Sequence, residues 1–333
     1  MNKCNSFYTV SLNPSIDYSF YLSDEILYDD INRVKETLVN AGGKGLNVAR
    51  MLTKLHCKCV AITFLGGENG EKLETLLNQE GVEYINIKIK ENVRSVYNFF
   101  SKEKVLRFNE TGPKISHSEK NKLFKLFDNI NLNSGDILVI SGSLPAGIGT
   151  KIYPQIIKLA KDKGVYTVLD SDREAFKEGI KEIPDIIKPN LWELERVSQQ
   201  KISTPETLYN ILENLCKKGI SAILLTLGSK GALYFSVDYI YYASVPKTRV
   251  ESTVGCGDTF LAGYLSGVYK GEPTGKCLRL AAASGTAKVM IKGTLMPSDK
   301  EITQIYKEIK VKQVKKEEFL RLFKDILATP ESL

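Results

Sequence analysis

Short apolar segments alternate with amphipathic segments along most of this chain, and this alternation constrains the fold more than any other feature. Patterns typical of buried strands occupy residues 7–12, 60–64, 137–140, 165–170, 186–188 and 222–226. Helical periodicity is found in residues 45–55, 72–79, 152–163, 191–198, 206–217, 258–269 and 277–290. Such alternation predicts an α/β fold in which helices cover both faces of a mostly parallel sheet. Ligands of these sheets bind beyond the carboxyl ends of the strands.

Local signals refine this prediction in three places. Ser116 and Glu119 form a capping-box pattern that opens a further helix, which ends near Phe127. Residues 18–38 and 95–108 interrupt the alternation with short polar–aromatic strands, which form either a small separate sheet or ordinary edge strands. Residues 310–333 are charged and expected to be helical, and no chemistry is assigned to them. Neither a repeat nor a linker divides residues 1–333, so we expect a single domain.

Composition limits the classes of partner. The chain has 333 residues and a formal net charge of +7, spread along the sequence, which favours attraction of small anions. No aromatic–basic interleaving accompanies this charge, so no nucleic-acid partner is expected. The six cysteines form no pair of C-x-x-C units, and no second cluster completes a zinc site. No leader pattern and no apolar run of roughly 20 residues is found, so we expect a cytoplasmic protein without a membrane partner.

The first segment that indicates chemistry is rich in glycine and reads Asn40-Ala-Gly-Gly-Lys-Gly-Leu-Asn47. Its glycines allow a ligand to approach the backbone closely, and the helix that follows offers free N–H groups. Lys44 and Asn47 add a cation and an amide that can bind phosphate and hydroxyl oxygens. The spacing is not that of a P-loop. The alternative is a tight turn without a ligand.

The second segment reads Ser252-Thr-Val-Gly-Cys-Gly-Asp-Thr259 and leads into an apolar helix. Gly255, Cys256 and Gly257 would direct backbone N–H groups into one concavity, which is an anion hole for a transferred phosphoryl group. Asp258 lies in the first helical turn, where the dipole favours an ionised carboxylate able to accept a hydroxyl proton. The alternative is an aspartate that only caps the helix.

Two further segments suit a nucleotide and its metal ion. Asn190 and Glu193 are three residues apart at a helix start and suit a water-coordinated Mg²⁺ beside phosphates, although a helix cap explains them equally. Thr226, Gly228 and Gly231 lie where a strand ends in a glycine turn, which could hold a ribose and a phosphate. The alternative is a hairpin to a strand at residues 232–235.

Together these segments resemble the ribokinase/PfkB family of carbohydrate kinases. The resemblance extends over residues 7–300 and includes an opening Asn13-Pro-Ser-Ile-Asp17 and a Lys188-Pro-Asn190 segment. The opening and the glycine-rich segment are most similar to the hexose-phosphate branch. The resemblance implies a ribokinase-like three-layer α/β/α fold, in which residues 18–38 and 95–108 form a small β-sheet lid that closes over the sugar and often mediates homodimerisation.

The resemblance also implies a role for each matching residue. It makes Asp258 the catalytic base and assigns the anion hole to Gly255, Cys256 and Gly257. It implies substrate-binding roles for Asp17, Gly42, Gly43, Lys44, Asn47, Arg94 and Ser143. The cofactor-binding positions that it implies are Lys188, Asn190, Thr226, Gly228 and Gly231, with Glu193 acting on the metal through water. Cys256 departs from the family's usual alanine or serine, and Asp172 and Arg173 receive no role.

The activity implied is ATP-dependent phosphorylation of a ketohexose phosphate, with fructose 1-phosphate giving fructose 1,6-bisphosphate as the favoured reaction. ATP and Mg²⁺ are the implied cofactors, and the sugar phosphate and ATP are the expected partners. Tagatose-6-phosphate kinase activity is the alternative reaction. A sugar-phosphate binding protein without activity is the other alternative, and the presence of Asp258, Asn190 and Glu193 argues against it.

Overall fold

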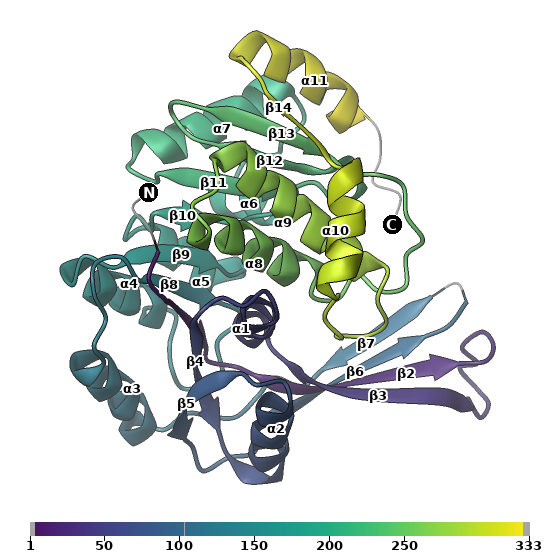
Figure 1. Ribbon diagram of the computed structural model, residues 1–333. Coiled ribbons are helices and arrows are strands. Elements are labelled where there is room, and N and C mark those ends of the chain that lie inside the picture. The colour runs from purple at the N-terminus through teal and green to yellow at the C-terminus, as the bar shows by residue number, and fades with distance from the viewer. Residues whose placement is uncertain (1–3, 103, 329–333) are drawn as a thin grey trace.

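A ten-stranded sheet forms the centre of the computed structural model, which describes residues 4–102 and 104–328 (Figure 1). In spatial order its strands are β14 (Lys310–Gln313), β13 (Ile240–Ser244), β12 (Ala232–Phe235), β11 (Ala222–Thr226), β10 (Ile186–Ile187), β9 (Tyr166–Asp170), β8 (Ile137–Ser141), β1 (Phe7–Ser11), β4 (Cys59–Leu65) and β5 (Glu83–Lys88). The strands from β11 to β5 run parallel, whereas β12, β13 and β14 are added antiparallel. The predicted α/β class is confirmed.

Helices cover both faces of this sheet and make it the middle of three layers. One hydrophobic core lies under α1 (Lys44–Lys54), α2 (Gly67–Gln79), α8 (Cys256–Tyr269), α9 (Thr274–Val289) and α10 (Asp299–Glu308). The other lies under α3 (His117–Asn129), α4 (Ile152–Asp162), α5 (Arg173–Ile180), α6 (Leu191–Ser198), α7 (Pro205–Lys217) and α11 (Lys316–Ala328). Strand β8 serves both cores, because Ile137 and Val139 enter the first while Leu138 and Ile140 enter the second.

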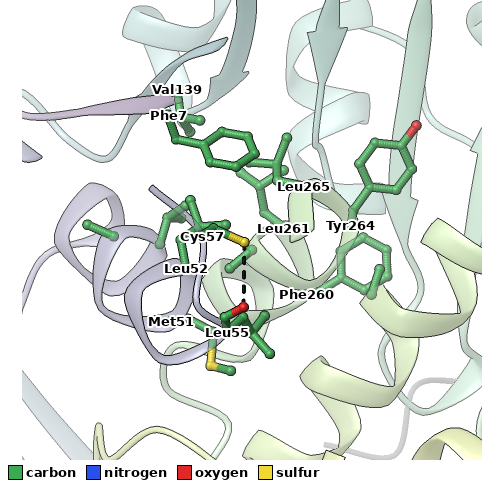
Figure 2. Packing of buried hydrophobic residues seen from close by; sticks show 14 of the residues in the cluster. Phe7, Met51, Leu52, Leu55, Cys57, Val139, Phe260, Leu261, Tyr264 and Leu265 are labelled. Carbon is green, nitrogen blue, oxygen red and sulfur yellow. Dashed lines mark hydrogen bonds between the residues drawn. The ribbon is translucent and has the colours of Figure 1, made fainter. Parts of the chain in front are cut away.

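Helices α1 and α8 pack directly against each other beside the sheet (Figure 2). Leu52 of α1 and Leu261 and Leu265 of α8 are completely buried between them, next to Phe7 and Val139 of the sheet. An interior packed to this extent resists movement of one helix past the other. The core therefore fixes the N-terminal ends of α1 and α8 relative to each other, and these ends carry Lys44 and Asp258.

A second, four-stranded sheet extends from the body (Figure 1). Its strands, in spatial order, are β3 (Val34–Gly42), β2 (Ser15–Leu22), β6 (Arg94–Phe100) and β7 (Val105–Asn109). Aromatic rings stack across β2 and β6, at 5.4 Å between the centroids of Tyr18 and Tyr97 and 4.9 Å between those of Phe20 and Phe99. The prediction of a small separate sheet is confirmed, and the edge-strand alternative is wrong. Residue 103 of the expected lid lies outside the described residues.

The C-terminal segment corrects one expectation. Lys310–Gln313 is not helical but forms strand β14, which pairs antiparallel with β13. This pairing satisfies the backbone groups of β13, which would otherwise be an open edge, and Val311 packs against the core. Helix α11 follows, and residues 329–333 of the expected tail lie outside the described residues. Elsewhere the capping box of Ser116 and Glu119 is present as predicted. No helix in the described ranges is both long and apolar enough to cross a bilayer.

Candidate active site

Several residues singled out from the sequence gather at one edge of the main sheet, together with Asp170, which was not among them. Lys44 and Asp258 stand in the first turns of α1 and α8. Asp170 ends β9, and Lys188 directly follows β10. These positions are the carboxyl ends of parallel strands and the N-terminal ends of helices, where anionic ligands are favoured.

Asp258 is held by a neighbour from α1. Its side chain is buried, and its Oδ2 accepts a hydrogen bond of 2.8 Å from Asn47 Nδ2. The other oxygen, Oδ1, has no hydrogen-bond partner among the described residues. Arg50 Nη1 in turn donates to Asn47 Oδ1 at 3.1 Å, which fixes the orientation of the amide. The bidentate pair between Arg50 and Glu80 anchors the guanidinium. Asp258 is therefore rigidly presented with one oxygen open to a ligand.

The backbone before Asp258 leaves N–H groups unpaired at the start of α8 within the described structure. Gly255 precedes α8 in a left-handed conformation with φ of 76°, which glycine adopts without strain. The N–H of Cys256 makes only a long bond of 3.5 Å to Thr253 O. The N–H groups of Gly255, Gly257 and Asp258 have no backbone acceptor among the described residues. Free donors at a helix start form an anion-binding site.

The ionisation of Asp258 differs from the expectation. The helix dipole was expected to favour the charged form, but burial dominates and, with the nearby Asp170, raises the pKa of Asp258 to about 6. Lys44, Asn47 and Lys188 oppose this shift without cancelling it. The carboxylate is thus the main form at neutral pH, as predicted, but it becomes protonated only slightly below neutrality.

Two lysines and two carboxylates form a compact charge network beside Asp258. Lys44 Nζ lies 3.2 Å from Asp170 Oδ1 and 3.6 Å from Glu193 Oε1. Lys188 Nζ lies 3.3 Å from the same Asp170 oxygen. Burial opposes ionisation of Asp170, but Lys188 and Lys44 outweigh it and lower the pKa of the carboxyl group. Asp170 therefore holds both ammonium groups at this edge.

Steric contacts and backbone conformation require glycine at the predicted positions of the glycine-rich turn. A Cβ at Gly42 would lie 2.0 Å from Asp17 Oδ1, and one at Gly45 would lie 2.7 Å from Val10 O. Gly43 has φ of 106°, which side chains rarely tolerate. Asp17 is buried against this turn and accepts from Ser15 Oγ at 2.6 Å. Burial, only partly opposed by Ser15, raises the pKa of Asp17 to about 6.

Arg94 and Ser143 lie at the base of the small sheet. The Arg94 guanidinium donates to Asn13 O, at 3.0 Å from Nη2 and 3.2 Å from Nε, and to Glu110 O at 3.1 Å. Asn13 Nδ2 donates to the exposed Ser143 hydroxyl at 3.2 Å. Because the guanidinium has five N–H groups, this arrangement leaves donors for a further anion.

In both segments assigned to the nucleotide, the structural alternative is present. Asn190 and Glu193 form a capping box at α6, with bonds of 2.8 Å and 2.9 Å between each side chain and the other's backbone N–H. Thr226 and the following turn join β11 to the antiparallel β12, so the hairpin alternative is present. Gly231 closes this turn through its backbone bonds with Leu227 and Gly228, and a Cβ there would lie 2.0 Å from Ala243 O of β13. Gly228 opens the turn between the strands.

The donors at this edge fit a metal ion that is held mainly by phosphates. Glu193 Oε1 and Asp170 are hard oxygen donors on either side of Lys44, and Asp170 Oδ2 is buried without a hydrogen-bond partner in the described structure. Mg²⁺ usually takes one or two carboxylates together with phosphate oxygens and waters. Within residues 4–102 and 104–328, no three acidic, histidine or cysteine side chains gather as a metal site of their own.

Sequence reasoning missed three charged residues at this site. Asp170 ends a parallel strand, and that position alone could have identified it. Arg107 lies on β7, and its Nη2 donates to Thr253 Oγ1 at 2.9 Å, so the small sheet touches the segment before α8. Lys288 lies in α9, and its Cε would lie 3.7 Å from a Cβ on Gly255 in the same segment; no sequence signal marked it. Asp172, to which no role was assigned, caps α5.

The fold and the convergent site define the class of protein: a kinase of ribokinase-like architecture that transfers a phosphoryl group to a carbohydrate. Residues 11–301 match the family described as pfkB family carbohydrate kinase. The chain therefore belongs to the pfkB family, as the resemblance implied.

Relatives with assigned names support the same class. A tagatose-6-phosphate kinase of Staphylococcus epidermidis is 33% identical over 92% of this chain and 99% of its own length. A 1-phosphofructokinase of Bacillus subtilis is 31% identical over 91% of this chain and 98% of its own. The structure of phosphofructokinase-2 from Escherichia coli in complex with substrates and products has a TM-score of 0.86 and 27% identity, covering 91% of this chain and 99% of that one.

Proposed function

We propose that this protein transfers the γ-phosphoryl group of ATP to a hydroxyl group of a ketohexose phosphate. The favoured reaction converts fructose 1-phosphate to fructose 1,6-bisphosphate. The observation that carries the proposal is the buried Asp258, held by Asn47 directly beside a row of free backbone N–H groups. A base next to an anion hole is the arrangement that phosphoryl transfer to an alcohol needs.

Each group has a place in the proposed step. The sugar hydroxyl gives its proton to Asp258 while its oxygen bonds to the γ-phosphorus, and the bond from that phosphorus to the β-phosphate oxygen breaks to release ADP. The N–H groups of Gly255, Cys256 and Gly257 stabilise the charge on the transferred group. Lys44 would contact the phosphates, since its ammonium is directed at the same edge. Asp17, Gly42, Gly43 and Asn47 would orient the sugar.

The nucleotide would lie against the ends of β10 and β11. Lys188, Asn190, Thr226, Gly228 and Gly231 are the proposed contacts of ATP. Mg²⁺ bound to the phosphates would neutralise their charge, and Glu193 would hold it through a water molecule. The support is the Glu193 oxygen that faces Lys44 and is not used in the capping box. We also propose that the protein is cytoplasmic.

A coupled ADP-release assay over a panel of sugar phosphates tests the function and separates its alternatives. We expect the largest kcat/KM with fructose 1-phosphate. A preference for tagatose 6-phosphate would assign the alternative reaction, which the similarity to the Staphylococcus epidermidis enzyme supports. ADP release without any sugar phosphate measures background hydrolysis. If a sugar phosphate of the panel bound to the protein but none raised ADP release above that background, the protein would be a sugar-phosphate binding protein without activity.

The pH dependence of turnover reports the proposed base. Asp258 must be ionised to accept the proton, and its pKa of about 6 lies above the ordinary value of an aspartate. We therefore expect kcat/KM to be constant above pH 7 and to fall about tenfold per pH unit below pH 6. Asp17 also has a pKa of about 6, so Asp17→Asn is the control: it should lower kcat/KM while keeping the acid limb. A profile that stayed flat down to pH 5 would rule out Asp258 as the base.

We further propose that the small sheet is a lid that orders when sugar phosphate binds. The support is its separation from the main sheet and the contact of Arg107 with Thr253 beside the anion hole. Closure would exclude water and favour transfer to the sugar over hydrolysis. Hydrogen exchange in residues 18–38 and 95–108 should slow when sugar phosphate is added. Unchanged exchange at confirmed saturation would remove the lid from the mechanism.

Dimerisation through the lid is the remaining part of the proposal. Phe108 on β7 exposes 57% of its surface, and Tyr28 and Ile31 in the loop between β2 and β3 each expose 74%, which suits a contact with a second copy. A dimer contact without a lid function would make exchange depend on protein concentration and not on the sugar. The hydrogen-exchange experiment at two protein concentrations therefore separates the two roles.

A further inference from the structure

Lys288, near the end of α9, is a completely buried lysine that the proposed reaction does not use. Its ammonium group donates to Gly293 O at 2.8 Å and approaches Ile291 O at 3.5 Å. Within the described residues it forms no ion pair with a carboxylate. Burying an ammonium group without a counter-charge costs folding free energy. The dipoles of the two carbonyl groups compensate only part of this cost. Packing alone therefore does not explain why a lysine occupies this buried position.

The Lys288 side chain lies next to the first residue of the anion hole. A Cβ on Gly255 would lie 3.7 Å from Lys288 Cε, and a Cβ on Gly257 would lie 3.3 Å from Lys188 Nζ. The two glycines around Cys256 are thus each flanked by a lysine. Burial lowers the pKa of Lys288 to about 8, and Cys256 and Asp258 act in the opposite direction, so the ammonium form is the main one at neutral pH.

The turn that Lys288 binds also contacts the small sheet. The Gly293 N–H donates to the Tyr21 hydroxyl at 2.6 Å, and Lys292 pairs with Glu36. Tyr21 and Glu36 belong to β2 and β3 of that sheet. The ammonium group of Lys288 therefore sits between the start of α8 and the turn on which the small sheet rests.

We propose that Lys288 is a positioning residue that acts as a built-in monovalent cation for the anion hole. Its ammonium group binds the carbonyls of Ile291 and Gly293 and thereby fixes the turn at residues 291–293 relative to the start of α8. At neutral pH it also adds a positive charge beside the N–H groups that receive the transferred phosphoryl group. This inference rests on the proposed phosphoryl transfer and adds to it that the enzyme needs no free monovalent cation at this position.

Two variants separate the charge from the hydrogen bonds. Lys288→Gln keeps donors for the carbonyls but removes the charge, and we expect kcat to fall on the order of 10- to 100-fold with a smaller change in the KM for ATP. Lys288→Ala leaves room for a small cation. Its kcat should fall similarly and rise saturably with ammonium or potassium ions, but not with choline. The wild-type enzyme should not respond to these ions.

A matched control is Lys54→Met, because Lys54 Nζ donates to Met296 O at 2.8 Å in the same loop but away from Gly255. This variant should keep wild-type kcat and show no cation response. Wild-type kcat in Lys288→Gln, or a folded Lys288→Ala without any response to ammonium and potassium, would overturn the inference. If one variant does not fold, the other decides. Inactivity of the wild-type enzyme on every sugar phosphate would instead be a failure of the proposed function.

Discussion

Replacing Asp258 by asparagine should reduce kcat by roughly 10²- to 10⁴-fold, the range typical of losing a positioned general base. Asparagine can still accept the hydrogen bond from Asn47, so the geometry at the start of α8 should be preserved. ATP binding, measured by calorimetry, should stay within a few-fold of wild type. The change should appear in kcat, because the proton is transferred only in the transition state.

Protein stability provides the control for this variant. The folded-state pKa of Asp258 is raised from 3.8 to about 6, so its contribution to the free energy of unfolding is present below pH 3.8 and is lost as pH rises through 6. At pH 8 the ionised carboxylate is therefore a cost that the neutral asparagine removes. We expect the melting temperature of Asp258→Asn at pH 8 to equal or exceed that of wild type. A folded variant with near-normal turnover would mean that Asp258 only caps the helix.

Removing Arg94 is the second change with a large expected effect. Arg94→Ala should raise the KM for the sugar phosphate roughly 10- to 150-fold, because a charge-assisted bond to phosphate contributes about 1.5–3 kcal/mol. The KM for ATP should change far less. Steady-state kinetics with each substrate varied in turn measures this difference.

Arg94→Lys is the matched variant for this prediction. It keeps the positive charge but loses the planar group that donates to Asn13 O and Glu110 O. We expect an intermediate KM for the sugar phosphate. If Arg94→Ala raised both KM values equally, or acted only by lowering the melting temperature, the guanidinium would be a structural tie between the two sheets and not a phosphate ligand.

The sequence was sufficient for the fold class and for the elements with strong periodicity. Buried parallel strands such as β8 are short continuous apolar runs, and helices such as α7 have a clear apolar face, so both can be recognised locally. The glycines at 42, 43 and 255 were also recognisable, because each lies in a short glycine-rich segment. The structure shows why glycine is needed there: a Cβ at Gly42 would clash with Asp17, and Gly43 and Gly255 have positive φ angles. The short edge strand β14 was missed, because its pairing partner β13 lies some 70 residues earlier in the chain.

Only the tertiary structure decided the charges of the site. The sequence places Asp258 at a helix start, where the dipole favours ionisation, but its pKa depends on how much of the folded protein excludes water from it. The bridging role of Asp170 depends on two lysines that follow other strands, at positions 44 and 188. Lys288 has no local signal at all, because its surroundings come from α8, α9 and the turn at 291–293. Periodicity and glycine spacing are written into consecutive residues, whereas desolvation and charge pairing are properties of neighbours in space.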